Sequence, residues 1–263
     1  MALKHQLRKI LPSGAVRILR DINTSIRKVL PVKWLTWYSN LKVSNFKDKS
    51  AKDVFTDIYT NKSFWGGAES VSGSGSDYSS TKSLIGDLDK LLVDLKISSV
   101  LDIPCGDFNW MYKVDYKNVK YLGADIVEDL IKINSEKYKD NDTFNFKVLN
   151  LIEDALPKSD LVIVRDCFVH LSFDNVYHSI KNIKASGSKY LLTTSFPDHP
   201  SNLDIITGGW RTLNFQEKPF NFPKPVLVIN ENYQGSNGMY PDKSMNLYEI
   251  DKIVVPGEVY KES

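Results

Sequence analysis

Apolar residues form two different patterns along residues 81–223 of the chain. Short apolar runs, typical of buried strands, alternate with longer stretches in which apolar residues recur at helical spacing. Strands that alternate with helices predict right-handed βαβ units, and hence a parallel sheet with helices on both faces. We expect strands over residues 97–103, 119–126, 144–149, 160–165 and 188–195, and helices over 81–95, 127–138 and 172–186.

The pattern changes near the C-terminus. Residues 224–231 and 243–250 are two more strand patterns, and the polar segment between them lacks a helical pattern. Two strands connected in this way pair antiparallel. The predicted fold is therefore α/β and Rossmann-like, with seven mostly parallel strands, an antiparallel C-terminal hairpin at one edge, and helices on both faces.

Residues 1–55 differ from the rest of the chain in both pattern and charge. Apolar residues recur at helical spacing over 3–11 and over 15–30, which predicts two amphipathic helices. Residues 1–52 hold 12 lysines and arginines and two acids, a formal charge of +10, whereas the remainder carries −8. We expect a basic helical extension over 1–55 and one α/β domain over 56–263.

This basic extension fits several roles. Its helices pack on the domain or on a second copy of the chain, or residues 1–50 form a peripheral anchor on an anionic membrane with Trp34, Trp37 and Tyr38 at the interface. An organelle transit segment is a third alternative. Because charge runs are usually solvated surfaces, we favour the packed helices.

Composition limits the class of protein and its location. Apolar residues make up 42% and charged residues 25% of the chain, as in soluble globular proteins. Cys105 and Cys167 lie far apart and lack the spacing of zinc ligands, which favours a reducing compartment. We recognise neither an apolar run long enough to span a membrane nor a secretory signal. We expect a cytoplasmic protein, with the membrane surface as the alternative, and no nucleic-acid partner.

The segment VLDIPCGDFNW, residues 100–110, ends the first expected strand of the sheet with acids and a glycine. Ligands of open parallel sheets bind beyond the carboxyl ends of the strands, near the first such turn. Asp102 suits a cationic group of a ligand there, and Gly106 lets the backbone approach it closely. Asp125, at the end of the second strand, stands where an acid accepts the hydroxyls of a ribose.

The same turn argues against a cofactor that carries phosphate. It lacks the Gly-x-Gly-x-x-Gly pattern, and Asp102 and Asp107 would repel a pyrophosphate. An adenosine with a positive charge fits these acids better. S-adenosylmethionine has a sulfonium, an ammonium and a ribose but no phosphate, and it is the cofactor that we expect.

Longer segments carry a resemblance to a known family: FWGGAESVSGSGSDYSST, VLDIPCGDFNWM, YLGADIVEDLI, LPKSDLVIVRDCFVHLSF, YLLTTSFPDHPSNLDIITGGWRTLNF and PFNFPKPVLVINE. Together they resemble the class I S-adenosylmethionine-dependent methyltransferases, in particular a bacterial subgroup associated with glycan modification. The resemblance covers about residues 55–255. It implies an enzyme that O-methylates a sugar of a glycan or glycan precursor. Alternatives are a methyltransferase for another small molecule or lipid, a nucleotide-dependent oxidoreductase or epimerase, and a scaffold without activity.

The resemblance also implies roles for particular residues. Pro104 and Phe108 stand where the commoner cofactor turn has glycines, and Asn150 stands where an acid is usual. The amide oxygen of Asn150 still accepts a hydrogen bond from an adenine amine. The residues that correspond to the cofactor site are Thr81 and the loop before it at the methionine end, Asp102 and Gly106 in the turn, Asp125 at the ribose, Asn150 and Leu151 at the adenine, and Arg165 and Asp166 beside the methyl group.

A sugar hydroxyl is a poor nucleophile at neutral pH, so a base is expected beside the transferred methyl group. His170, which follows the fourth strand, is one candidate, with Asp166 orienting it. The plain alternative is that His170 packs beneath a helix capped by Ser172. His199, after the fifth strand, is the rival base. Asp198, His199 and Asp204 also have the oxygen-rich character of a magnesium site, but loop acids at this spacing usually cap turns, and we expect no metal.

The long segment 206–225 precedes the C-terminal hairpin and is rich in aromatic residues. Aromatic planes and an arginine at the ligand edge suit stacking on sugar rings and hydrogen bonding to hydroxyls. An irregular arm packed into the core explains the same residues equally well. The residues concerned are Trp210, Arg211, Phe215, Phe220 and Phe222.

Overall fold

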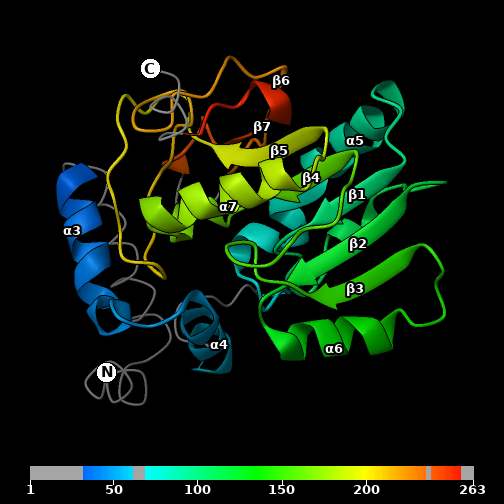
Figure 1. The fold of residues 1–263 in the computed structure, drawn as a ribbon, viewed down its shortest axis with the longest axis horizontal. Helices are drawn as coiled ribbons and strands as arrows, with labels where there is room; N and C mark the ends of the chain where they lie inside the picture. Colours follow the sequence, from blue (N-terminus) through cyan, green and yellow to red (C-terminus); the bar gives the residue numbers. More distant parts are fainter. Residues whose placement is uncertain (1–31, 62–68, 235–237, 256–263) are drawn as a thin grey trace.

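A computed structural model describes residues 32–61, 69–234 and 238–255 of the chain. One twisted sheet crosses the molecule, with helices packed around it (Figure 1). Its seven strands have the order β3-β2-β1-β4-β5-β7-β6. They are β1 (Ser99–Asp102), β2 (Lys120–Asp125), β3 (Phe144–Val148), β4 (Leu161–Val164), β5 (Tyr190–Ser195), β6 (Leu227–Asn230) and β7 (Ser244–Glu249).

The strand directions confirm the predicted fold. Strands β1 to β5 run parallel, and β7 is antiparallel to both β5 and β6. This is the Rossmann-like sheet with an antiparallel C-terminal hairpin that the apolar pattern predicted. The strand order reverses between β1 and β4, so a crevice opens beyond their carboxyl ends, where ligands of such sheets bind.

The three helices predicted within the α/β domain are also present. They are α5 (Tyr78–Asp94), α6 (Glu128–Lys137) and α7 (Phe173–Ala185). Ser172 caps α7 as expected, because its hydroxyl accepts a hydrogen bond from the backbone N–H of Asn175. The helices predicted over 3–11 and 15–30 lie outside the described residues. No described helix has both the length and the apolar character needed to cross a bilayer.

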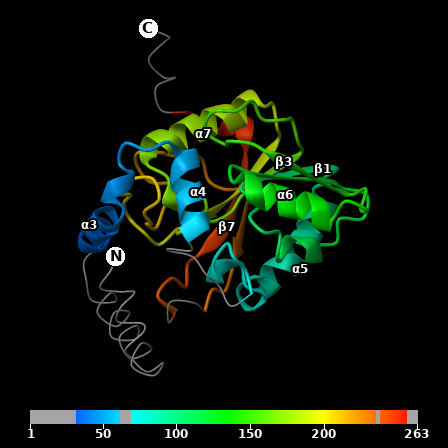
Figure 2. The ribbon, with the colours of Figure 1, turned by 90° about the horizontal axis from the view of Figure 1, so that it is seen from below.

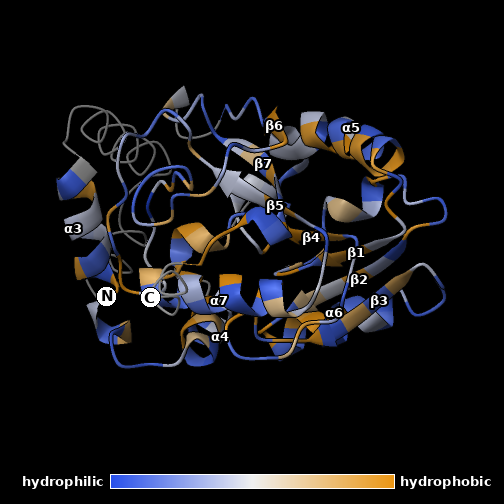
Figure 3. Cartoon of the chain, turned by 45° about the horizontal axis from the view of Figure 1, so that its top comes forward, coloured by the Kyte–Doolittle hydropathy of each residue, from blue (hydrophilic) through white to orange (hydrophobic). Residues whose placement is uncertain are grey.

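Each face of the sheet has its own apolar core. Alternate residues of a strand point to opposite faces, so Leu101 packs with α7 whereas its neighbour Val100 packs with α5. In the view of Figure 3 the hydrophobic colour follows the strands and the helix sides that face them. Helix α6 contacts β2 and β3. Helices therefore cover both faces, as the sequence predicted.

Two further helices, α3 (Val32–Lys42) and α4 (Ala51–Asn61), flank the carboxyl ends of the strands (Figure 2). The hydroxyl of Ser39 and the amide oxygen of Asn40 accept hydrogen bonds from the backbone N–H groups of Trp210 and Ile206, at 2.8 and 2.9 Å. A small apolar cluster joins α4 to the turn after α3; its buried members are Val43, Phe46, Val54 and Ile58. The predicted boundary at residue 55 stays a prediction.

Gly208 permits this close docking, which gives a first prediction. It has φ of +94°, and an added Cβ would lie 2.7 Å from Val54 Cγ1 and 2.9 Å from the Phe46 ring. We expect Gly208→Ala to lower the free energy of unfolding by about 1–3 kcal/mol in urea titrations. Gly86→Ala in α5 is the control, since nothing lies within 4 Å of its added Cβ. Equal stability of the two variants would contradict the packing of Val54 and Phe46 against Gly208.

Candidate functional site

Two cavities meet beyond the carboxyl ends of β1 and β4. The first, of about 610 Å³, is lined by the predicted acids Asp102 and Asp125, and we call it the acidic cavity. The second, of about 460 Å³, is lined by Tyr38, Phe196, Trp210, Tyr233 and Tyr240, and we call it the aromatic cavity. Both are lined by Ser72, Ser76, Asp166 and His170, so these residues stand where the two cavities join.

Asp102 ends β1 at the wall of the acidic cavity. Its side chain is buried, and its Oδ2 accepts a hydrogen bond from the Tyr121 hydroxyl at 2.6 Å. Burial raises the pKa of this carboxyl to about 7, against the opposing effect of the Tyr121 hydrogen bond. No described lysine or arginine forms an ion pair with Asp102. A buried carboxylate in this state favours a cationic ligand.

Asp125 ends the neighbouring strand β2 in the same cavity. Its two carboxylate oxygens accept hydrogen bonds from the backbone N–H groups of Gly106, at 3.1 Å, and Val127, at 2.9 Å. Burial raises the pKa of Asp125 to about 6, although these N–H groups lower it. Each oxygen keeps a second lone pair, so the fixed carboxylate can accept two hydroxyl groups of a ligand.

The turn after β1 is covered by residues 69–77. Gly106 has φ of +56°, and an added Cβ would collide with the Ser72 hydroxyl. The carboxylate of Asp107 accepts hydrogen bonds from the Val71 N–H, at 2.8 Å, and from the Ser70 hydroxyl, at 2.9 Å. Asp107 thus holds the cover in place, a role that the sequence interpretation missed.

The remaining residues expected at the cofactor do not all reach the acidic cavity. Gly106, Asn150, Leu151 and Arg165 line it. The Asn150 amide oxygen already accepts a hydrogen bond from the Ile152 N–H at 3.0 Å. Thr81 does not line it, because its hydroxyl turns into the first turn of α5 and donates to the carbonyl of Asp77. The role expected for Thr81 stays a prediction, whereas the loop before it does cover the cavity.

A buried ion network lies at the join between the cavities. Arg165 pairs with Glu231 at 2.5 Å, and Lys243 pairs with Asp166 at 2.7 Å. Burial raises the pKa of Asp166, but Lys243 and Arg165 outweigh this and hold it well below its usual range. Arg165 also donates to the carbonyl of Gly75, so the network holds the covering loop as well. Glu231 and Lys243 flank the hairpin connection and carried no recognisable signal in the sequence.

His170 lies at the join, and the carbonyl of Gly209 holds its ring. Its Nδ1 lies 2.7 Å from the carbonyl oxygen of Gly209, and the backbone N–H of Gly208 donates to the His170 carbonyl. Burial lowers the pKa of the ring to about 4, so His170 is neutral at pH 7. With Nδ1 donating to Gly209, the acceptor nitrogen of the ring is Nε2. Asp166 pairs with Lys243 and also raises the pKa of His170, against the larger effect of burial, so the Asp166–His170 pair stays a prediction.

His199 belongs to the aromatic cavity, with a carboxylate beside it. Its Nδ1 lies 3.2 Å from Asp242 Oδ2. Asp204 instead caps α7 by accepting the Phe173 N–H at 2.7 Å. The proposed grouping of Asp198, His199 and Asp204 around magnesium does not form, and the described residues contain no cluster of three or more His, Cys, Asp or Glu suited to a metal ion.

Segment 206–225 divides between the two predicted roles. Trp210 lines the aromatic cavity, with its ring centroid 5.1 Å from that of Tyr240. Arg211 is buried and donates to the carbonyls of Phe168 and Leu171, so it supports the turn that carries His170. The other three aromatic residues, Phe215, Phe220 and Phe222, pack in the core on the α7 side of the sheet.

Comparisons with known proteins give similarity in structure only. No family model matches the chain. No curated protein matches it. Similar solved structures include the magnesium protoporphyrin IX methyltransferase ChlM of Synechocystis PCC 6803 with bound SAH, at 15% identity over 57% of this chain and 74% of that one, with a TM-score of 0.45.

Two further structures are similar to the same degree. The methyltransferase domain of a bacterial protein, CtHen1-C, shares 14% identity over 47% of this chain and 72% of its own, with a TM-score of 0.40. Protein PH0226 of Pyrococcus horikoshii OT3 shares 22% identity over 45% of this chain, with a TM-score of 0.40; the chain spans 57% of its length. Likeness of this degree assigns neither a family nor a substrate to the chain.

The raised pKa of Asp102 gives a second prediction. In the folded protein this carboxyl keeps its proton up to about pH 7, whereas in the unfolded chain it loses the proton near pH 4. Ionising the buried carboxyl therefore lowers the free energy of unfolding progressively as the pH rises from about 4 to about 7, and the whole loss is present above about pH 7. We expect Asp102→Asn to raise the free energy of unfolding by about 1–3 kcal/mol at pH 8 and by much less near pH 4.

Asp160→Asn is the contrast, because the Ser98 hydroxyl lowers the pKa of that carboxyl. Its substitution is expected to destabilise the protein at pH 8. Urea titrations at both pH values measure these effects. A loss of stability in Asp102→Asn at pH 8 would contradict the account of a buried, uncompensated acid.

Proposed function

We propose that the protein is an S-adenosylmethionine-dependent methyltransferase that methylates a hydroxyl of a sugar in a glycan or glycan precursor. One observation carries the proposal: a cavity with two buried acids at adjacent strand ends opens onto a second cavity lined by aromatic side chains. The first fits a cationic adenosine and the second fits an acceptor. Both volumes fall in the range of small-molecule sites, roughly 300–1,000 Å³.

The acidic cavity fits this cofactor better than a nucleotide. Asp102 is suited to the ammonium or sulfonium, and Asp125 to the ribose hydroxyls. Arg165, which also lines the cavity, already pairs with Glu231 and so offers little to a phosphate. Apolar residues complete the wall where an adenine would lie: Ile126, Val127, Leu149, Leu151 and Ile152.

When bound, S-adenosylmethionine supplies an electrophilic methyl group on sulfur. The residues of the chain then have to align the acceptor and receive its proton. His170 stands at the join of the cavities with a neutral ring whose orientation is fixed by Gly209. It is our first choice for the proton acceptor. His199, beside Asp242, is the second.

The aromatic cavity supports a sugar acceptor. The rings of Trp210 and Tyr240 offer flat apolar surfaces of the kind that stack on sugar rings. His199, Thr212 and Lys243 place hydrogen-bonding groups in the same wall. A non-sugar small molecule is the alternative that an acceptor panel would reveal.

Cofactor binding tests the proposal most simply. Isothermal titration is expected to show binding of S-adenosylmethionine and none of NAD. Asp125→Asn should weaken binding by at least about tenfold, because two charge-assisted hydrogen bonds to the ribose are lost. Asp142→Asn, an exposed turn residue, is the matched control and should bind as the unmodified protein does. Binding of NAD alone would rule the proposal out.

The proton acceptor is tested by methyl-transfer rates over a panel of sugars. Removal of a general base typically costs about 10²–10⁴-fold in rate, so we expect His170→Ala to lose this much while retaining cofactor affinity. His178→Ala, at an exposed position on α7, controls for histidine removal. A large loss in His199→Ala alone would transfer the role to His199. Full activity in both variants would reject both assignments.

A further inference from the structure

Helix α3 presents two different faces. Its inner face is anchored to segment 206–210 through Ser39 and Asn40, and the aromatic cavity is lined from this side by Leu35, Thr36 and Val43. Its outer face carries apolar and aromatic side chains at helical spacing, which we call the outer stripe: Trp34, Trp37 and Leu41. Tyr38 lies at the edge of this stripe and also lines the aromatic cavity. The helix therefore connects the aromatic cavity to an exposed apolar surface.

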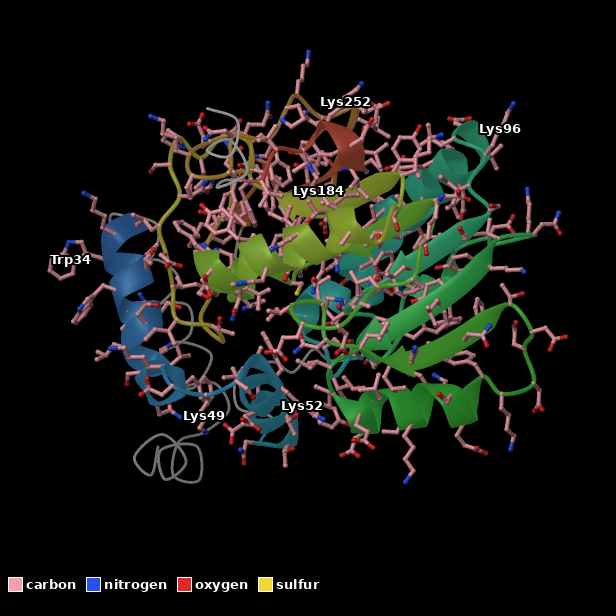
Figure 4. The ribbon with its side chains drawn as sticks, viewed as in Figure 1. Trp34, Lys49, Lys52, Lys96, Lys184 and Lys252 are labelled. Atoms are coloured by element: carbon pink, nitrogen blue, oxygen red, sulfur yellow. The ribbon has the colours of Figure 1, made fainter. Side chains whose placement is uncertain are left out.

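The outer stripe is unusual for a surface that meets only water. Trp34 is 61% exposed, Trp37 is 60% exposed and Leu41 is 56% exposed. Figure 4 shows Trp34 projecting away from the body of the protein. The two tryptophan rings contact each other edge to face at 6.3 Å, so they form one continuous patch. Contiguous exposed patches of this kind mark interaction sites.

The charge around the stripe indicates what it meets. Residues 32–52 contain five lysines and one acid, Asp48, a formal charge of +4. Lys33 precedes the stripe, and Lys42 at its end lies over the ring of Tyr38 at 4.4 Å. Lys49 and Lys52 follow on the connection to α4 and on α4 itself (Figure 4). Tryptophan and tyrosine with flanking lysines is the composition of helices that lie in the interface of anionic membranes.

We propose that α3 docks the protein on an anionic lipid surface through the outer stripe. Trp34, Trp37 and Leu41 enter the headgroup region, while the surrounding lysines contact lipid phosphates. Because the opposite face of α3 lines the aromatic cavity, docking holds that cavity next to the lipid headgroups. This proposal does not depend on the methyltransferase activity, because it rests on α3 and the lysines on and near it.

Co-sedimentation of the full chain with vesicles tests the proposal. Vesicles that contain phosphatidylglycerol should sediment the protein, vesicles of phosphatidylcholine alone should do so poorly, and added salt should weaken binding. The double variant Trp34→Ser/Trp37→Ser should reduce partitioning by at least about tenfold. Val93→Ser/Ile133→Ser removes exposed apolar side chains from α5 and α6 and should have no effect.

Three results would overturn the proposal. The first is that the protein fails to bind the anionic vesicles. The second is that the tryptophan variant binds them as well as the unmodified chain does, which would mean that another segment, such as residues 1–31, carries the binding. The third is that sedimentation equilibrium shows a dimer that the tryptophan variant does not form, which would mean that a second copy of the chain covers the stripe. Circular dichroism shows in each case that the variant is folded.

Discussion

The site depends on two carboxyl groups that are buried at adjacent strand ends and form no ion pair with a described lysine or arginine. The sheet itself places them there, because β1 and β2 are parallel neighbours and end at the same edge with Asp102 and Asp125. Burial raises the pKa of both groups, to about 7 and about 6. Buried carboxyl groups of this kind do not stabilise the fold in the absence of a ligand. Their position is therefore best explained by a ligand whose positive charge or hydroxyl groups pair with them.

The rest of the site is arranged around these acids by ties between distant segments. Asp107 holds the covering loop from one side and Arg165 holds it through Gly75 from the other. Arg165 and Lys243 hold Asp166 in its ionised form. The result is an acidic cavity, an aromatic cavity beside it, and a neutral His170 where they join.

The fold was predictable from the sequence because its signal is local. Apolar runs mark the strands, and the lack of a helical pattern between the last two strands marks the hairpin. That Asp102, Gly106 and Asp125 line one cavity was predictable for the same reason, since the two acids end neighbouring strands and Gly106 lies in the turn after β1. Roles that depend on pairing across the fold were not predictable, because the partners are far apart in the sequence. The separations are 37 residues for Asp107 and Ser70, 66 for Glu231 and Arg165, and 39 for His170 and Gly209.

Calorimetry of S-adenosylmethionine binding at pH 7, in buffers of different ionisation enthalpy, tests the central claim most directly. Asp102, with its pKa near 7, is about half protonated in the free protein. A bound cation lowers that pKa, so binding should release about half a proton, and Asp102→Asn should abolish the release. Binding without proton release, or with proton uptake, would contradict the claim that the cation meets this carboxyl.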